Sequence, residues 1–285
     1  MNRTLYRFIT LLSAQAPKMT IPAVSMRRTP WHTGQMHYRE YPPHPALAAH
    51  VDCVWAAQAP AWAHTHRVLP DNCLDILWQD SGQPGFAVGM MRSAILVTSE
   101  RPVRTMAVRF KPGMAGPFLA MPLHALTDQR AEIDLLWGRS DAGRLGDALW
   151  NSAAPERARL ALIERELLRR LRLDSAAGNG SAALVQQALR ALEASAGALR
   201  VEQLAVQLQV SRQHLAAQFR THVGLSPKLY ARICRFRRAT AALGASAGTD
   251  WARLAQECGY FDQSHLIHDF QEFAGSAPER FHFSN

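Results

Sequence analysis

A chain of 285 residues has room for one large domain or two domains of ordinary size. Its 48% hydrophobic and 19% charged residues exclude a broadly disordered protein, and its apolar runs fall short of the roughly 18–20 residues that span a bilayer. Four scattered cysteines (Cys53, Cys73, Cys234 and Cys258) do not form a disulfide framework, which favours a reducing, cytoplasmic setting.

The net charge of +9 is unevenly distributed along the chain. Residues 200–243 hold eight Lys/Arg against Glu202 alone, whereas residues 244–285 hold two basic and six acidic side chains. A local basic surplus of this kind predicts a polyanionic partner for the segment 200–243.

Residues 1–35 contain five Lys/Arg and no acid. We expect a flexible basic tail here, or a translation start at Met19, Met26 or Met36. A secretory signal is disfavoured, because the apolar core "FITLL" is shorter than such signals need.

Residues 36–109 read as strands and turns, since Pro and Gly separate short apolar runs at 50–58, 66–79, 85–91, 94–98 and 103–110. The last run alternates imperfectly, as a half-buried strand does. Its apolar side holds Met106, Val108 and Phe110, and its mixed side holds Thr105, Ala107 and Arg109.

The segment 155–172 is typical of an amphipathic helix, with one apolar face made of Leu160, Ile163, Leu167, Leu168 and Leu171. This face either packs on the protein's own sheet or forms a homodimer surface. The small residues of "DSAAGNGS" (174–181) predict a linker. We therefore expect an α+β sensor-like domain at 36–173 (strand-rich with C-terminal helices) and an all-α domain at 182–285.

The C-terminal segment repeats itself: "SRQHLAAQFRTHVGLSPKLY" (211–230) returns as "DQSHLIHDFQEFAGSAPERF" (262–281). The offset drifts from 50 to 51, which predicts one extra residue in the second turn, around "GYFD". Each copy has the spacing of a helix, a tight turn and a second helix, as in a helix-turn-helix unit. The segment between them, 227–243, predicts one linker helix.

Five motifs carry a family resemblance: "LAxxxxVSxxHLxxxF", "GLSPxxY", "RxxRA", "LAxECGYxDQSHLxxxF" and "GxxPxxF". With these motifs, the last hundred residues resemble the DNA-binding domain of AraC/XylS-family transcription regulators. The resemblance implies two helix-turn-helix units joined by a linker helix, and an activator or repressor that binds double-stranded DNA. The segments "YPPHPALAAHVDCVW", "RVLPDNCLDILW" and "VRFKPGMAGPFL" resemble a sensor-like domain found in one subgroup of that family.

The predicted recognition helices are 211–222 and 262–273, and two rigidly linked units would meet successive major grooves about 34 Å apart. We expect His214 to pack or cap near the turn. The base-edge candidates are Arg212, Gln213, Ala216, Ala217, Gln263, Ser264, His265 and His268. The phosphate candidates are Ser211, Arg220, Lys228, Arg232 and Arg235. The acidic second unit adds sequence preference or contacts RNA polymerase, unless its acids only form a solvated face.

The N-terminal domain offers weaker signals. Five aromatic residues either line a pocket for a small-molecule effector or belong to the core: Trp55, Trp62, Trp78, Phe86 and Phe110.

The sequence of this domain also bears on metal binding and catalysis. Cys53, His64, His66 and Cys73 lack the paired spacing of zinc ligands, so we expect no metal and no cofactor. Acidic neighbours should raise the pKa of Cys73. We find no motif of an enzyme. The alternatives are an architectural DNA binder without effector control, or an enzyme or metal/redox sensor based on this domain.

Overall fold

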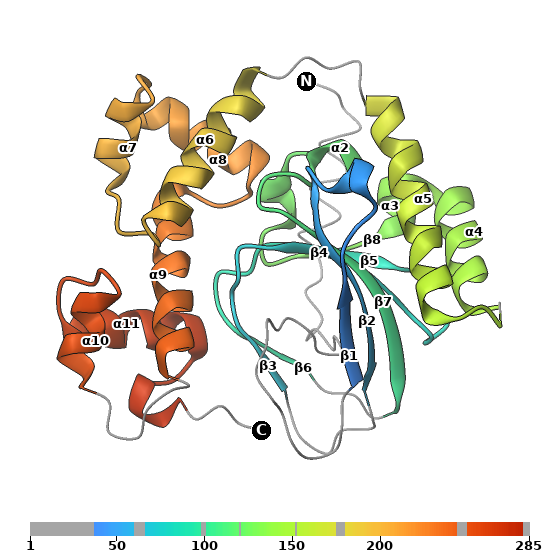
Figure 1. The fold of residues 1–285 in the computed structure, drawn as a ribbon, viewed down its shortest axis with the longest axis horizontal. Coiled ribbons are helices and arrows are strands. Elements are labelled where there is room, and N and C mark those ends of the chain that lie inside the picture. Colours follow the sequence, from blue (N-terminus) through green and yellow to red (C-terminus); the bar gives the residue numbers. More distant parts are fainter. Residues whose placement is uncertain are drawn as a thin grey trace.

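The computed structural model describes residues 37–59, 66–97, 101–119, 121–151, 153–174, 180–243 and 250–281. Figure 1 shows two lobes side by side, one built around a sheet and one made of helices. The predicted basic tail at 1–35 lies outside the described residues, as does most of the predicted linker at 174–181.

The N-terminal lobe is built on a six-stranded sheet in the order β1-β2-β7-β4-β5-β8, in which every neighbouring pair is antiparallel. Its strands are β1 (His37–Tyr41), β2 (Val51–Ala59), β4 (Leu74–Gln79), β5 (Phe86–Val88), β7 (Val103–Phe110) and β8 (Arg130–Glu132). A second, two-stranded sheet pairs β3 (His66–Val68) with β6 (Ile95–Val97).

The helices of this lobe are η1 (Pro45–Leu47), α2 (Gly116–Leu119), η2 (Leu123–Leu126), α3 (Ile133–Trp137), α4 (Arg139–Trp150) and α5 (Glu156–Asp174). The predicted amphipathic helix at 155–172 is therefore confirmed as α5. Its residues Leu160, Ile163 and Leu167 are fully buried in the core that α5 shares with β2 and β7. The apolar face therefore packs on the protein's own sheet, the first of the two alternatives.

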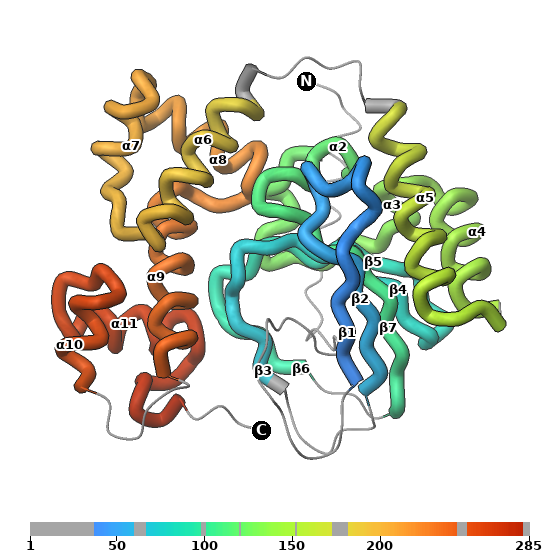
Figure 2. Tube along the Cα trace, viewed as in Figure 1, coloured from blue at the N-terminus to red at the C-terminus, as the bar shows by residue number. Residues whose placement is uncertain are grey.

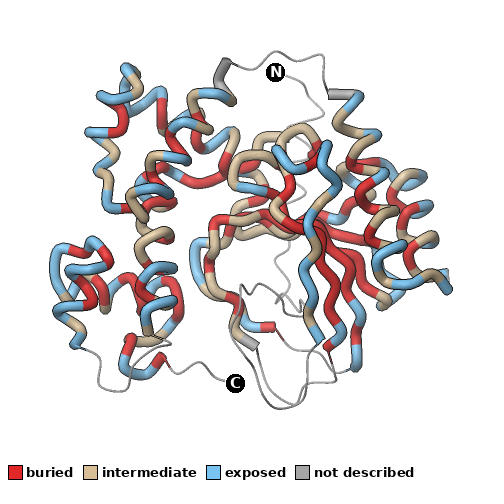
Figure 3. Tube along the Cα trace, viewed as in Figure 1, coloured by how far each residue is buried: buried red, intermediate tan, exposed pale blue. Residues whose placement is uncertain are grey.

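The expectation that β7 is half-buried was wrong. Met106, Val108 and Phe110 join the large core under the helices, as expected. On the other side Thr105, Ala107 and Arg109 are also buried, because Val68 of β3 and Val97 of β6 pack over that face in a second cluster. Figure 3 shows the central strands buried along most of their length.

Two further differences separate the sequence-based strands from the observed ones. The apolar run 66–79 is split into β3 and β4 by a turn at Asn72, whose φ of 65° is left-handed. The short edge strand β8 lies beyond residues 36–109, the segment in which the sequence predicts strands.

The C-terminal lobe is entirely helical in its described part, with α6 (Gly180–Ala194), α7 (Val201–Gln207), α8 (Arg212–His222), α9 (Pro227–Leu243), α10 (Trp251–Glu257), α11 (Gln263–Ala274) and η3 (Pro278–Arg280). Figure 2 shows α9 running from the α7–α8 pair to the α10–α11 pair. The predicted fold class, an α+β domain followed by two helix-turn-helix units on a linker helix, is confirmed.

Candidate nucleic-acid interface

The first helix-turn-helix unit is fixed by a short set of backbone contacts. Gln209 takes a left-handed φ of 55°, and the next N–H, of Val210, donates to Ala205 O at 3.1 Å. Ser211 then caps α8, because its Oγ accepts from the His214 N–H at 3.1 Å. Leu215 and Phe219 anchor one face of α8 in the core, so the opposite face of the helix points outward.

The second unit reproduces these contacts. Gly259 has a φ of 79°, the Tyr260 N–H donates to Ala255 O at 2.9 Å, and Asp262 caps α11 by accepting from the His265 N–H at 2.7 Å. The offset to the first unit is 50 residues up to Tyr260 and 51 from Asp262 onward. The predicted extra residue in the second turn is therefore confirmed, and it is Phe261.

The first recognition helix presents an open polar end. Ser211, Arg212, Gln213, Ala217 and Arg220 are exposed, and Ala216 is half-buried. Arg212 forms an ion pair with Glu202 at 3.3 Å, but both side chains are mostly exposed, and surface pairs of this kind contribute at most about 1 kcal/mol. The pair therefore does not prevent Arg212 from reaching DNA.

His214 departs from expectation, because its side chain is exposed and only its backbone is capped. Its counterpart His265 is half-buried, with its ring edge-on to Tyr260 at a centroid distance of 5.3 Å. In the second unit Ser264 and His268 are exposed and Gln263 is half-buried. His268 Nε2 lies 3.5 Å from a carboxylate oxygen of Glu272 on the same helix.

Two of the predicted phosphate contacts have internal partners instead. The Arg232 guanidinium donates to the fully buried Asp269 at 2.6 and 3.0 Å and to Glu272 at 2.5 Å, which ties α9 to α11. Arg235 Nη1 donates to Gly197 O at 2.6 Å, and its guanidinium lies over the Tyr260 ring. Both guanidinium groups therefore already have partners inside the helical lobe.

The N-terminal lobe contacts the C-terminal ends of both recognition helices. Thr127 Oγ1 donates to Gly224 O, just after α8, at 2.7 Å. The Ala94 N–H donates to Phe273 O, in the last turn of α11, at 2.9 Å. The N-terminal halves of α8 and α11 lie at the outer edge of the lobe, away from the sheet (Figure 1).

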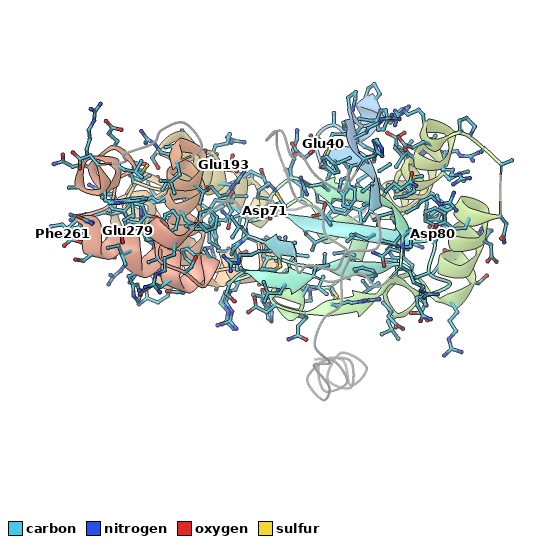
Figure 4. The ribbon with its side chains drawn as sticks, turned by 90° about the horizontal axis from the view of Figure 1, so that it is seen from below. Glu40, Asp71, Asp80, Glu193, Phe261 and Glu279 are labelled. Atoms are coloured by element: carbon cyan, nitrogen blue, oxygen red, sulfur yellow. The ribbon has the colours of Figure 1, made fainter. Side chains whose placement is uncertain are left out.

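A third contact reaches the linker helix. The buried Asn72 donates from Nδ2 to Tyr230 O at 3.3 Å and to Cys234 Sγ at 3.5 Å. Arg237 Nη1 donates to Asp71 O at 3.1 Å. Figure 4 labels Asp71 between the two lobes. The turn between β3 and β4 therefore packs directly against α9.

The aromatic residues proposed to line a pocket do not form a single site. Trp78 and Phe110 belong to the large core, whereas Trp55 and Phe86 belong to the second cluster on the other face of the sheet. Trp62 lies outside the described residues. Residues on opposite faces of a sheet cannot line one cavity.

A buried polar cluster accompanies Trp55 on its face of the sheet. The Trp55 indole N–H donates to Asp75 at 3.1 Å, and Arg109 Nε lies 3.2 Å from the same carboxylate oxygen. Burial, partly offset by Arg109, raises the pKa of Asp75 to about 6. Burial, and then the charge of Asp71, raises the pKa of the Cys73 thiol well above its usual value, in the expected direction.

The part of the chain that the structure describes also bears on two other classes of site. No three His, Cys, Asp or Glu side chains of that part gather as a metal site would require. Within the same part, no helix combines the length and apolar character needed to cross a bilayer.

Two family models match parts of the chain. Residues 204–282 match the family described as a helix-turn-helix domain, and this match spans both units. The chain carries an AraC-type helix-turn-helix domain. Residues 39–132 match a domain of unknown function, DUF6597. The chain has no match among curated proteins.

Solved structures of ToxT from Vibrio cholerae align with most of this chain at low sequence identity. ToxT from strain O395 is 9% identical, with 78% of this chain and 94% of ToxT covered and a TM-score of 0.41. ToxT with a bound unsaturated fatty acid, from strain SCE256, is 11% identical, with 86% and 92% covered and a TM-score of 0.41. TM-scores in this range do not identify equivalent side chains.

Sequence reasoning missed two residues of the N-terminal lobe that contact the helical lobe. Asn72 and Thr127 contact backbone carbonyl oxygens across the lobes, and no sequence pattern marks such a contact.

The Arg232–Asp269 pair gives a stability prediction. Arg232→Met leaves Asp269 buried without its charged partner, so the free energy of unfolding should fall by about 3–5 kcal/mol in urea titrations. Arg232→Met with Asp269→Leu should recover most of that loss. Arg238→Met, at an exposed position on α9, is the matched control. A loss below about 1 kcal/mol in Arg232→Met would show that the pair does not hold the two helices.

The raised pKa of Asp75 predicts a pH dependence of stability. Between the ordinary aspartate value of about 3.9 and the folded value of about 6, the folded chain binds a proton that the unfolded chain does not. Stability should therefore fall as pH rises through this window, by on the order of 2–3 kcal/mol from this group, and level off above it. Asp75→Asn should remove this component from unfolding curves recorded between pH 4 and 7. An unchanged slope in Asp75→Asn would assign the dependence to other groups.

Proposed function

We propose that this chain is a transcription regulator that inserts α8 and α11 into successive major grooves of a promoter. The observation that carries the proposal is the pair of units with the same turn and cap, each opening its recognition helix with exposed polar residues. The 17 residues of α9 span about 26 Å, which is comparable to the spacing of about 34 Å between successive grooves.

The base contacts would come mainly from the first turns of the recognition helices. Gln213 suits a bidentate contact to adenine, and Arg212 suits guanine or a phosphate. Ala216 and Ala217 offer only small apolar surfaces, such as a thymine methyl group would meet. In the second unit Gln263, Ser264 and His268 are the candidates, with the half-buried His265 behind them.

The phosphate contacts would come from fewer residues than the sequence suggested. Arg220 and Lys228 are exposed cations at the end of α8 and the start of α9. Ser211 has its side chain engaged in capping, which leaves the N-terminal end of α8 to attract a phosphate. With Arg232 and Arg235 engaged inside the lobe, nonspecific affinity rests on this smaller set.

We further propose that the N-terminal lobe regulates DNA binding by setting the spacing of the two recognition helices. Its contacts at Gly224 and Phe273 hold the C-terminal ends of both helices, and Asn72 holds the linker helix between them. A change in this lobe would therefore move both helices together relative to DNA.

An effector would act most directly on the buried polar cluster. Arg109 is 3% exposed, and its Nη2 has no hydrogen-bond acceptor among the described residues. Leaving a charged donor unsatisfied is costly, so a small molecule with an acceptor oxygen would gain by meeting it. Asp75 of the same cluster is three residues from Asn72, which connects the cluster to α9.

The remaining partners follow from the same proposal. A DNA-binding regulator acts where the chromosome is, in the cytoplasm, and no catalytic step is assigned to either lobe. One chain carries both recognition helices, so a homodimer is not needed to read one site. RNA polymerase contact is proposed for the acidic second unit when it is not fully engaged with DNA.

The salt dependence of DNA binding tests this function. The full chain should bind DNA from upstream of its own gene in the presence of excess random competitor. Arg220→Ala and Lys228→Ala should each weaken binding to all sequences and flatten the slope of log K against log [salt] by about one. Arg165→Ala, which removes an exposed charge from α5, should change neither quantity.

Two other results of the same binding experiment would favour a different function. Binding that random competitor abolishes would favour an architectural DNA binder. A chain that binds no DNA at any salt concentration would refute the proposal and return attention to the N-terminal lobe.

The regulatory role of the interface gives a second prediction. Asn72→Gly keeps the left-handed turn but removes the bonds to α9, and Thr127→Val removes the hydroxyl that holds Gly224. The double variant should lose about 3–10-fold in specific affinity, because the helices are no longer held at one spacing. Its salt slope and nonspecific affinity should match the parent chain. A gain in specific affinity would instead show that the interface restrains the DNA-binding lobe.

A further inference from the structure

Phe261 is an apolar side chain that the fold leaves almost entirely in water. It is 90% exposed, whereas its neighbour Tyr260 is buried and stacks edge-on against His265. It is also the one residue by which the second helix-turn-helix turn exceeds the first. The turn closes through Tyr260 and caps through Asp262, so neither requires a phenylalanine between them.

The position of Phe261 places it beside the DNA. It directly precedes the cap of α11, at the end of the recognition helix that enters the groove. In Figure 4 Phe261 lies at the outer edge of the C-terminal lobe, on the side opposite the sheet. The contact of α11 with the N-terminal lobe is at its other end, through Phe273. Nothing in the described part of the chain therefore separates Phe261 from a duplex bound along α11.

The charge of the second unit makes an apolar contact valuable. Residues 250–281 carry six acidic and two basic side chains. One of those two, Arg253, is paired with Glu257 at 2.8 Å. Because of this acidic surplus, the second unit attracts DNA phosphates only weakly. An aromatic ring against deoxyribose or a thymine methyl adds affinity without needing a positive charge, since burial of apolar surface does not depend on charge.

We propose that Phe261 is a DNA-contacting residue, whose ring packs against sugar and base-methyl groups at the rim of the second major groove. The proposal rests on the proposed function, because it needs α11 to dock in that groove. It assigns part of the second unit's affinity to an apolar contact instead of an ionic one.

The test is Phe261→Ala in the full chain, with the duplex from upstream of the chain's own gene as probe. Specific affinity should fall about 4–13-fold, the loss expected for about half the burial of a phenylalanine ring. The salt slope should stay the same, because no ionic contact is lost. Phe261→Leu should stay within about threefold of the parent chain. Unfolding midpoints should not move, since the exposed ring supports no core.

Val206→Ala is the matched control, because Val206 is also an exposed apolar residue, 76% exposed, on the outer surface of the first unit. It should leave affinity unchanged.

The other outcomes are separable. A parent chain that binds the duplex and a Phe261→Ala variant that binds equally well would overturn this proposal and leave the proposed function intact. The same equal binding with reduced transcription from the promoter would overturn it in favour of a protein partner for Phe261. Failure of the parent chain itself to bind would refute the proposed function, and this proposal with it.

Discussion

The position of α11 on the linker helix depends on a charged contact inside the C-terminal lobe. Asp269 has no exposed surface, and an ionised carboxylate stays in such a place only with a close cation. Arg232 supplies that cation from α9, so the ion pair joins α11 to the linker helix. Arg235 acts similarly toward the first unit by donating to Gly197 O. Both arginines thus join elements within the helical lobe.

The repeat and its caps were predictable because they are local. A residue that closes a tight turn, a cap that accepts from the third N–H, and apolar residues four apart each leave a signature within twenty residues. This is why both helix-turn-helix units, the linker helix and the extra residue at Phe261 followed from the sequence. The same locality explains the prediction for α5, whose apolar face has one regular period.

The errors came from contacts between distant segments. An arginine on a helix has the same appearance whether it faces phosphate or a buried carboxylate 37 residues away, as Arg232 does. The second face of β7 is buried only because β3 and β6 pair and cover it, which alternation along β7 cannot reveal. The sequence alone does not distinguish Trp55 from Trp78 as pocket residues, but their side chains lie on opposite faces of the sheet. Asn72 donates to the backbone carbonyl oxygen of Tyr230, and the sequence does not mark this contact because every residue type has a backbone carbonyl group.

Gly224 illustrates how closely the two lobes have been fitted to each other. Its φ of 89° is left-handed, and a methyl group at this position would lie 2.0 Å from Met90 Cε and 3.0 Å from Leu123 O. The turn that ends the first recognition helix therefore also packs directly against the N-terminal lobe. A chimaera that joined this helical lobe to an unrelated sensor would lose this contact. A chimaera that kept the sensor but placed a side chain at position 224 would have to move Met90 and the backbone at Leu123. The two lobes are therefore complementary in shape at this contact, and a change on one side needs a matching change on the other.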